Sequence, residues 1–257
     1  MYLEKYSLKG KTAFITGGGR GIGLAAAEAL LEVSADVIIA DIDEAVLASG
    51  HAYLSEKGYE VEAQRLDVTK PASVASAAKS ANERHGSVDI MVASAGIAWP
   101  DTPGEDIPND VWRRLIDVDL NGVYWCCREF SRHMLQRGRG SIVTLGSISG
   151  VISNKPQRQA HYNAAKAGVH HLTKSLAGEW AERGVRVNCV APTYVDTPMS
   201  NASFGDPERM PIWMDFTPMR RVARPDEIAS AILFLATDAS SAITGATVMV
   251  DCGYTVW

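Results

Sequence analysis

The chain has 257 residues, of which 46% are hydrophobic and 21% charged, and its formal net charge at pH 7 is −5. This composition is typical of a globular protein and excludes a disordered chain. The acidic balance and the lack of a Lys/Arg run argue against nucleic acid as a partner. No apolar stretch approaches the roughly 20 residues of a membrane span, and residues 1–10 carry no apolar signal-peptide core, so we expect no membrane partner.

The four cysteines are Cys126, Cys127, Cys189 and Cys252, and they form no C-x-x-C motif. Spacings of that kind are what predicts a zinc site or a redox motif. We therefore expect reduced, buried thiols, no metal site and a cytoplasmic location.

Short aliphatic runs alternate along the chain with longer segments of helical periodicity. The runs predicted as strands are Thr12–Thr16, Val37–Asp41, Glu62–Leu66, Ile90–Ala93, Ser141–Leu145, Val185–Val190 and Ala246–Val250. The segments predicted as helices are Gly21–Val33, Glu44–Lys57, Pro71–His85, Asp110–Arg137, His161–Arg183 and Pro225–Ala236. This alternation predicts a doubly wound (Rossmann) α/β fold, a parallel seven-stranded sheet with helices on both faces. No linker or compositional shift divides residues 1–257, so we expect a single domain.

The segment 193–219 interrupts this alternation with several prolines and aromatic residues but no clear period. Irregular segments of such length are uncommon inside a domain and often form a lid over a binding site. We predict a substrate lid here, and the alternative is a surface excursion packed by its own aromatic side chains.

A glycine-rich loop follows the first predicted strand and opens the first predicted helix. The glycines allow a tight turn and a close approach of the backbone to a ligand. The helix start offers unpaired N–H groups and the positive end of the helix dipole to a pyrophosphate. In this strand–loop–helix position the motif predicts a dinucleotide site, formed by Gly17, Arg20, Gly21, Ile22 and Gly23.

Asp41 ends the second predicted strand, and we assign it and the following Ile42 to the cofactor site. A carboxylate there accepts hydrogen bonds from the adenosine ribose and repels a 2′-phosphate. Arg20 has the opposite preference, but it can turn into solvent, whereas Asp41 is fixed at a strand end. We therefore predict NAD as the cofactor, with NADP as the less favoured alternative.

Two further loops are expected at the same edge of the sheet, where ligands bind in open α/β folds. Asp67 and Val68 follow the third strand and are predicted to contact the adenine, although Asp67 could instead cap the next helix. Ser94, Ala95 and Gly96 follow the fourth strand and are also assigned to the cofactor.

Tyr162 and Lys166 lie four residues apart and therefore share one face of a predicted helix. A free phenol, with a pKa near 10, is a poor base at neutral pH. A neighbouring cation favours the phenolate, so Lys166 can make Tyr162 a proton-transfer group. Ser147 stands just past the fifth strand, where its hydroxyl can donate to a substrate oxygen.

In these features the chain resembles the short-chain dehydrogenase/reductase family, and the resemblance spans nearly all of it. The matching residues are 16–23, Asp41, Asp67, Val68, Ala95, Gly96, Ser147, Tyr162, Lys166, Ala191, Pro192 and Thr197. The resemblance implies that Tyr162 is the general acid/base, that Ser147 orients the substrate oxygen, and that Lys166 binds the ribose. It further places Pro192, Val195 and Thr197 at the nicotinamide, and it implies a homotetramer.

The chain departs from the family pattern at three positions. Ala93-Ser94 stands where the family usually has two asparagines, and Thr193 stands where it usually has glycine. Asp119 occupies the position of the fourth catalytic residue, an Asn that is held to act through its backbone carbonyl and a water. We assign Asp119 to the catalytic residues, as part of a proton relay in which it adds negative charge near Lys166.

Within the family, the loop after Ser147 and the C-terminal sequence look like polyol dehydrogenases and ketose reductases. A polyol needs several hydrogen-bonding partners, and the predicted substrate residues are Ser149, Asn154, Gln157, His161 and Thr193. The alternative is that these side chains only shape the loop. The expected function is an NAD-dependent oxidoreductase for a sugar alcohol/ketose pair. The rivals are a reductase of a 3-oxoacyl thioester and a catalytically silent nucleotide sensor.

Overall fold

The computed structural model describes residues 1–200 and 204–257. Its sheet consists of β1 (Thr12–Thr16), β2 (Asp36–Asp41), β3 (Val61–Arg65), β4 (Ile90–Ala93), β5 (Gly140–Leu145), β6 (Val185–Pro192) and β7 (Thr247–Val250). The α-helices are α1 (Gly21–Glu32), α2 (Glu44–Glu56), α3 (Pro71–His85), α4 (Asn109–Ile116), α5 (Val123–Arg137), α6 (Ala160–Trp180), α8 (Arg209–Phe216) and α9 (Pro225–Ala236). Within the described ranges no helix is long and apolar enough to cross a membrane.

The seven strands run parallel in the order β3-β2-β1-β4-β5-β6-β7, which confirms the predicted fold class. The inner strands β1 and β4 are buried at every position, while the edge strands β3 and β7 are only partly covered. Continuous apolar runs are what a sheet covered on both faces requires.

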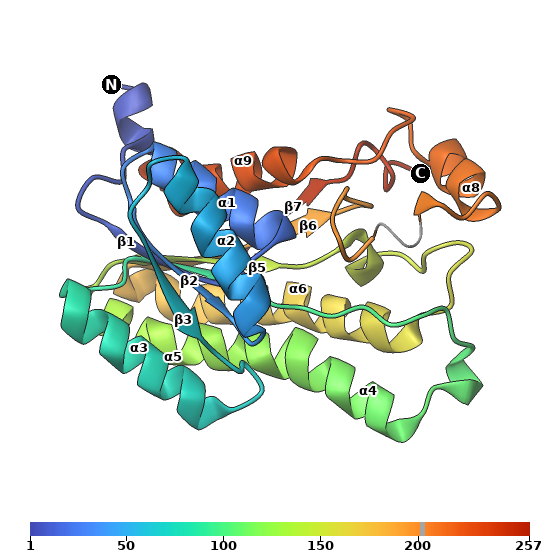
Figure 1. Cartoon of the computed structure of the whole chain (residues 1–257), viewed down its shortest axis with the longest axis horizontal. Coiled ribbons are helices and arrows are strands. Elements are labelled where there is room, and N and C mark those ends of the chain that lie inside the picture. Colours follow the sequence, from blue (N-terminus) through green and yellow to red (C-terminus); the bar gives the residue numbers. More distant parts are fainter. Residues whose placement is uncertain (201–203) are drawn as a thin grey trace.

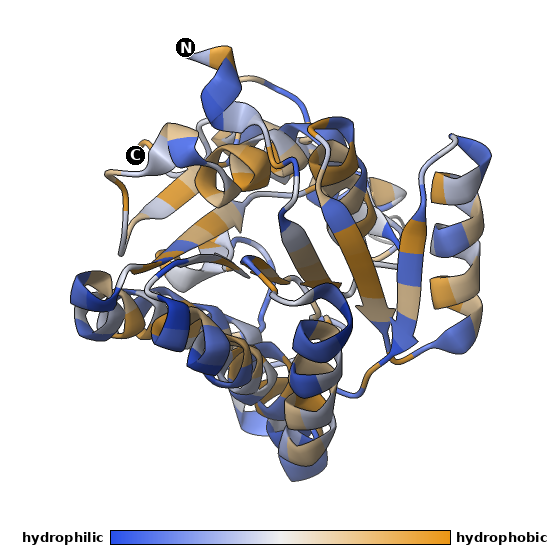
Figure 2. Cartoon of the chain, turned by 90° about the vertical axis from the view of Figure 1, so that its left-hand side faces the viewer, coloured by the Kyte–Doolittle hydropathy of each residue, from blue (hydrophilic) through white to orange (hydrophobic). Residues whose placement is uncertain are grey.

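Helices cover both faces of the sheet (Figure 1). Side chains of α1, α2 and α9 form one hydrophobic cluster with one face, and side chains of α3, α5 and α6 form a second cluster with the other. Viewed along the sheet, the strands are mostly apolar and lie between these helical layers (Figure 2). Phe14 of β1 and Phe130 of α5, with ring centroids 4.6 Å apart, belong to the second cluster.

Two predictions about helices were wrong in detail. The predicted helix Asp110–Arg137 is interrupted by a π-helical turn, Asp117–Gly122, between α4 and α5. This turn brings Asp119 into the interior, where it is fully buried. The predicted irregular segment 193–219 contains the short helix α8, whose Trp213 is buried; the prolines and aromatics there concealed its period.

Candidate active site

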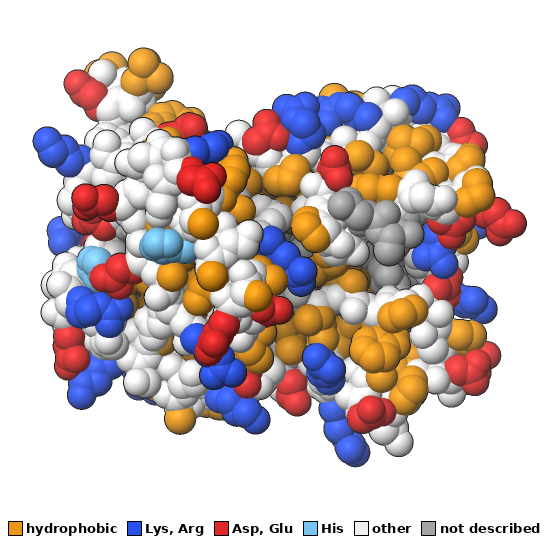
Figure 3. Space-filling view, in the orientation of Figure 1, with side chains coloured by type: hydrophobic (Ala, Val, Ile, Leu, Met, Phe, Trp, Pro, Cys, Tyr) orange, Lys and Arg blue, Asp and Glu red, His pale blue; other side chains and the backbone are white. Residues whose placement is uncertain are grey.

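The strand order reverses between β1 and β4, because β1 has β2 on one side and β4 on the other. At such a reversal the loops leaving the carboxyl ends of the strands diverge and leave a crevice. A cavity of about 800 Å³ lies at this edge of the sheet. Figure 3 shows the surface hollowed near the middle of this face, with apolar and basic side chains at the margin of the hollow.

The glycine loop can pack tightly only because its glycines lack side chains. Gly17 has φ +64°, and a Cβ built on it would lie 2.9 Å from the Cα of Ala95. A Cβ on Gly23 would lie 2.1 Å from the carbonyl oxygen of Gly17, which no side chain permits. The hydroxyl of Thr16 accepts a hydrogen bond from the Ala95 amide at 3.2 Å and joins the two loops. The N-terminus of α1 is thereby held at the cavity with room for a pyrophosphate.

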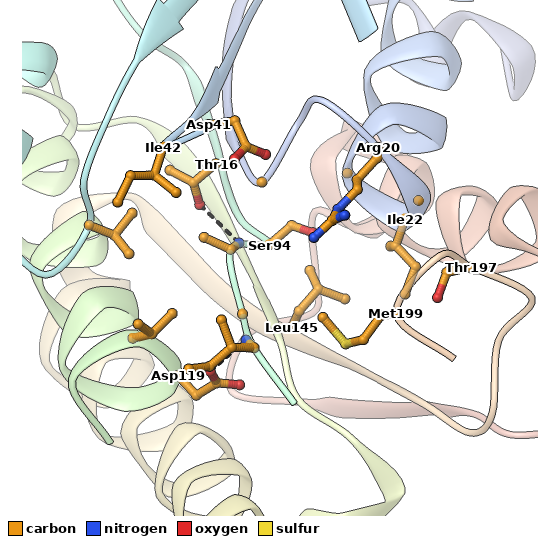
Figure 4. A pocket seen from close by; sticks show the side chains of 18 of the residues that line it. Thr16, Arg20, Ile22, Asp41, Ile42, Ser94, Asp119, Leu145, Thr197 and Met199 are labelled. Atoms are coloured by element: carbon orange, nitrogen blue, oxygen red, sulfur yellow. Dashed lines mark hydrogen bonds between the residues drawn. The ribbon is translucent and has the colours of Figure 1, made fainter. Parts of the chain in front are cut away.

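Arg20 and Asp41 enter the cavity from different elements, the start of α1 and the end of β2 (Figure 4). The Asp41 carboxylate accepts a hydrogen bond from the Asp43 amide at 3.2 Å, which ties it to the turn before α2. Beside it, Ile42 is half-exposed and presents an apolar surface to the cavity. A flat apolar ring can pack on Ile42 while a ribose hydroxyl donates a hydrogen bond to the Asp41 carboxylate.

Asp67 does not cap helix α3. Its carboxylate accepts hydrogen bonds from the backbone and the hydroxyl of Thr69, at 2.9 and 2.7 Å, whereas the helix begins after Lys70. The carboxylate therefore stabilises the loop and still lines the cavity.

The residues present fit a nicotinamide dinucleotide. The evidence is the glycine cradle, the helix start and the length of the cavity, which reaches from Asp41 to Lys166. The cavity is lined by every residue predicted to bind the cofactor: Gly17, Arg20, Gly21, Ile22, Gly23, Asp41, Ile42, Asp67, Val68, Ser94, Ala95, Gly96, Tyr162, Lys166, Pro192, Val195 and Thr197.

Ser147 is positioned through both its backbone and its side chain. Its amide donates a hydrogen bond to Nε2 of His170 at 3.4 Å, and its Oγ accepts one from the Ser149 amide at 3.1 Å. Because the Ser149 amide occupies an acceptor position of the Ser147 hydroxyl, the hydroxyl proton is left to donate to another oxygen. His170 is itself buried, and burial with the nearby Lys166 and Lys174 lowers its pKa to about 4.

Tyr162, Lys166 and His170 follow one another at i, i+4 and i+8 on the same face of α6. Lys166 Nζ lies 5.5 Å from the centre of the Tyr162 ring and donates a hydrogen bond to the Leu145 carbonyl at 3.1 Å. This bond holds the ammonium group at the end of β5, two residues before Ser147. The phenol, the ammonium and the serine hydroxyl therefore meet in one cavity.

Asp119 forms a direct ion pair with Lys166, whose Nζ lies 3.1 Å from Oδ2. Its other oxygen accepts a hydrogen bond from the Ile97 amide at 2.8 Å, so the carboxylate is fixed between the π-helical turn Asp117–Gly122 and the loop after β4. Burial alone would lower the pKa of Lys166, but the Asp119 charge, with Tyr162, more than offsets burial and raises it. Lys166 is therefore held as a cation.

Burial raises the pKa of Tyr162, and the Asp119 charge adds to this effect. Lys166 and the Ser147 hydroxyl act in the opposite direction without overcoming it. The sequence predicts a lowered pKa from Lys166 alone. The difference arises mainly because the phenol is buried, which disfavours the phenolate, and the Asp119 charge adds to the effect of burial.

The predicted substrate residues lie in three different settings. Thr193 lines the cavity, and its hydroxyl oxygen is buried without a hydrogen-bond partner among the residues described. Ser149, Asn154 and Gln157 lie outside the lining, and their side chains hydrogen-bond within a network of their own. His161 is fully buried beside the cavity, within electrostatic range of Asp119, and lacks a ring-nitrogen partner in the described part of the chain.

Sequence reasoning missed several residues at the site. His170 could have been found from its spacing, since it continues the face of Tyr162 and Lys166. Further unforeseen lining residues carry no motif that marks them, among them Asp110, Arg113 and Arg114 of α4 and Pro198 and Met199 after β6. Across the ranges described, no group of three or more His, Cys, Asp or Glu side chains could hold a metal ion.

Comparisons with known proteins agree with this geometry. A family model described as enoyl-(acyl carrier protein) reductase matches residues 17–255. The galactitol 2-dehydrogenase of Rhizobium johnstonii is 48% identical over 256 residues, covering 100% of this chain and 99% of that protein. The sorbose reductase of Candida albicans is 43% identical over 255 residues, covering 98% of this chain and 90% of that protein.

Solved structures are similar over the full length. The crystal structure of gox2181 has a TM-score of 0.98 at 47% identity and covers 100% of both chains. A gluconate 5-dehydrogenase from Burkholderia cenocepacia, in complex with NADP and tartrate, has a TM-score of 0.94 at 33% identity and covers 100% of both chains. A short-chain type dehydrogenase/reductase from Mycobacterium marinum has a TM-score of 0.94 at 34% identity and covers 99% of both chains. The present chain belongs to the short-chain dehydrogenase/reductase family.

Proposed function

We propose that this protein is an NAD-dependent oxidoreductase that interconverts a sugar alcohol and its ketose. The observation that carries the proposal is the meeting of Ser147, Tyr162 and Lys166 in the same cavity as the glycine loop. The names of the two relatives, a galactitol 2-dehydrogenase and a sorbose reductase, support the polyol class.

Each side chain has a distinct task in this reaction. The Ser147 hydroxyl donates a hydrogen bond to the substrate oxygen and orients it. The Tyr162 oxygen accepts the alcohol proton in oxidation and returns it in reduction. Lys166, held as a cation by Asp119, favours the phenolate form of Tyr162. When bound, the nicotinamide cofactor accepts or supplies the hydride.

The preference for NAD over NADP rests on Asp41. A carboxylate and a phosphate a few ångströms apart repel by about 1–4 kcal/mol at effective dielectric constants of 80 to 20. Arg20 lines the same cavity and favours a phosphate, and the gluconate 5-dehydrogenase was solved with NADP. We infer that Asp41 dominates, because its hydrogen bond to the Asp43 amide fixes it at the ribose position.

The polyol is proposed to lie between Ser147 and Thr193. Thr193 lines the cavity, and its buried hydroxyl has no hydrogen-bond partner among the described residues, so a rotation of the side chain would present it to a substrate hydroxyl. An unpaired buried hydroxyl costs free energy, and a hydroxylated ligand removes that cost. Ser149, Asn154 and Gln157 support this end of the site from behind.

A substrate panel tests the proposal. Initial rates with NAD and NADP are measured for pentitols, hexitols and, in reverse, ketoses and acetoacetyl thioester. The thioester is included because the matching family model is described as an enoyl-(acyl carrier protein) reductase. We expect turnover of at least one polyol/ketose pair with NAD. Activity on the thioester alone would overturn the sugar-alcohol assignment, and NAD binding without turnover of any compound would favour a nucleotide sensor.

We further propose that the protein acts in the cytoplasm as a homotetramer. The C-terminal Val256 and Trp257 are exposed and apolar, and a neighbouring subunit could cover them. Light scattering should give four times the 27.7 kDa mass of one chain, and a fluorescent fusion tests the location.

A further inference from the structure

Gln157 joins two segments that border the substrate end of the cavity. Its side-chain Oε1 accepts a hydrogen bond from the Tyr194 hydroxyl at 2.9 Å and another from the Trp213 indole at 3.0 Å. Tyr194 and Trp213 stack with ring centroids 3.8 Å apart and planes 11° apart. Two parts of the lid, the start of residues 193–219 and helix α8, are thus held by one carbonyl oxygen from the loop after Ser147.

The loop side of this connection leads back to the reacting centre. Asn154 donates a hydrogen bond from Nδ2 to the Tyr194 hydroxyl at 3.3 Å, and its Oδ1 accepts one from Ser149 at 2.6 Å. The Ser149 amide in turn donates to the Ser147 Oγ at 3.1 Å. A continuous set of hydrogen bonds therefore runs from Ser147 to the lid.

The lid side leads to the cavity wall. Thr193 and Val195 line the cavity on either side of Tyr194 in the sequence, whereas Tyr194 does not line it. The chain bends at Tyr194, just after the end of β6. The ring of Tyr194 stacks on Trp213 outside the cavity, while its two sequence neighbours form part of the cavity wall, so a shift of the ring must move that wall.

A second tie joins the same two segments next to Gln157. Asp101 accepts hydrogen bonds from Arg158 at 2.8 Å and from Arg209, the first residue of α8, at 3.2 Å. Arg158 follows Gln157 in the chain. The loop and α8 therefore meet at two adjacent points, one through neutral hydrogen bonds and one through ion pairs.

We infer that Gln157 is a positioning residue, whose carbonyl fixes Tyr194 and Trp213 so that Thr193 stands at a set distance from Ser147. It acts on the affinity for the hydroxylated substrate and not on the adenosine end of the cavity, which no part of this network reaches. This inference rests on the proposed function for the identity of the substrate. It differs from a direct contact between the Gln157 amide and the polyol.

Two substitutions at Gln157 separate the acceptor from the amide. Gln157→Glu keeps an oxygen that accepts from both donors but loses the NH₂ group, whereas Gln157→Met loses the acceptor at similar volume. We expect Gln157→Met to raise the KM for the polyol roughly tenfold, as the loss of two modest hydrogen bonds implies. The KM for NAD should stay near that of the wild type, and Gln157→Glu should retain most of the substrate affinity. Gln136→Met, at an exposed position on α5, serves as the matched control.

The donors supply an independent comparison. Tyr194→Phe and Trp213→Phe each remove one donor while keeping an aromatic ring. When combined with Gln157→Met, they should raise the KM for the polyol little further, because the shared acceptor is already gone. If Gln157→Glu is as damaging as Gln157→Met and both donor variants are neutral, the amide touches the substrate directly and the positioning role is overturned.

A readout without substrate keeps this test separate from the proposed function. Tryptic cleavage after Arg209, followed by mass spectrometry, should be faster in Gln157→Met than in Gln157→Glu or the wild type. That result supports the positioning role even if the panel finds no polyol activity. Equal cleavage in all three proteins, with an unchanged KM for whichever alcohol is turned over, would overturn it.

Discussion

The Nζ atom of Lys166 lies 3.1 Å from Oδ2 of Asp119, and both side chains are almost wholly excluded from solvent. The family pattern has an uncharged Asn at the Asp119 position. In this chain Lys166, the lysine proposed to act in catalysis, therefore has a counter-ion of its own. The loop after β4 closes over the pair, since a Cβ on Gly96 would lie 3.1 Å from the same oxygen of Asp119.

Replacing Asp119 with Asn should shift the pH dependence of both reaction directions downward. The Asp119 charge contributes to raising the pKa of Tyr162, whereas Lys166 opposes the rise, so removing the carboxylate leaves the cation to act alone. Oxidation requires the phenolate, and its acid limb should move to lower pH. Reduction requires the phenol, and its alkaline limb should move the same way. Rates from pH 5 to 10 measure both limbs.

Buried His161 also interacts electrostatically with Asp119. The shift of the pH profile therefore belongs to Asp119, His161, Tyr162 and Lys166 together. Asp106→Asn, at an exposed position outside the cavity lining, is the control and should leave the profile in place. A shift of the limbs to higher pH in Asp119→Asn would contradict the assigned role.

Replacing Tyr162 with Phe should remove catalysis and leave cofactor binding intact. General acid–base groups contribute about 10²–10⁴-fold to rates, so we expect kcat to fall by that factor. Titration of NAD by fluorescence or calorimetry should give nearly the wild-type Kd. Tyr2→Phe, at a side chain 76% exposed, is the matched control. A Tyr162→Phe enzyme with more than a tenth of the wild-type kcat would exclude Tyr162 as the proton-transfer group.

Replacing Asp41 with Ala should improve the use of NADP. The substitution removes a repulsion that electrostatics puts at about 1–4 kcal/mol, so kcat/KM with NADP should rise roughly tenfold or more. The value with NAD should fall as the ribose loses its acceptor. Asp36→Ala, at the exposed start of the same strand, should change neither value. A wild-type enzyme that already prefers NADP would show that Arg20 outweighs Asp41.

His170 should make the folded protein sensitive to acid. Burial, reinforced by Lys166 and Lys174, lowers its pKa to about 4, whereas the unfolded chain protonates near 6.5. Between these values unfolding takes up a proton, so the stability contributed above pH 6.5 is lost as the pH falls toward 4, by about 3 kcal/mol in total. Urea unfolding from pH 7.5 to 4.5 measures this slope.

The variant His170→Gln keeps an acceptor for the Ser147 amide but does not titrate. Its stability should therefore depend less steeply on pH than that of the wild type over this range. Burial also lowers the pKa of His161, and the difference between wild type and variant removes that shared contribution. Parallel slopes for the two proteins would mean that His170 takes up its proton in the folded state near its ordinary pKa.

The sequence by itself determined the sheet, the glycine loop and the pairing of Tyr162 with Lys166, because these depend on local patterns. Apolar runs define strands that are buried on both faces, Gly17 and Gly23 stand where backbone passes against backbone, and Tyr162 and Lys166 share a helix face by spacing alone. Only the tertiary structure decided the partners of buried polar groups. Asp119 contacts Lys166 because of a π-helical turn that the sequence periodicity does not predict. Gln157 accepts hydrogen bonds from Tyr194 and Trp213, which lie in a segment without a clear period. A buried donor or acceptor needs a hydrogen-bond partner, and that partner comes from whichever distant segment the fold packs beside it.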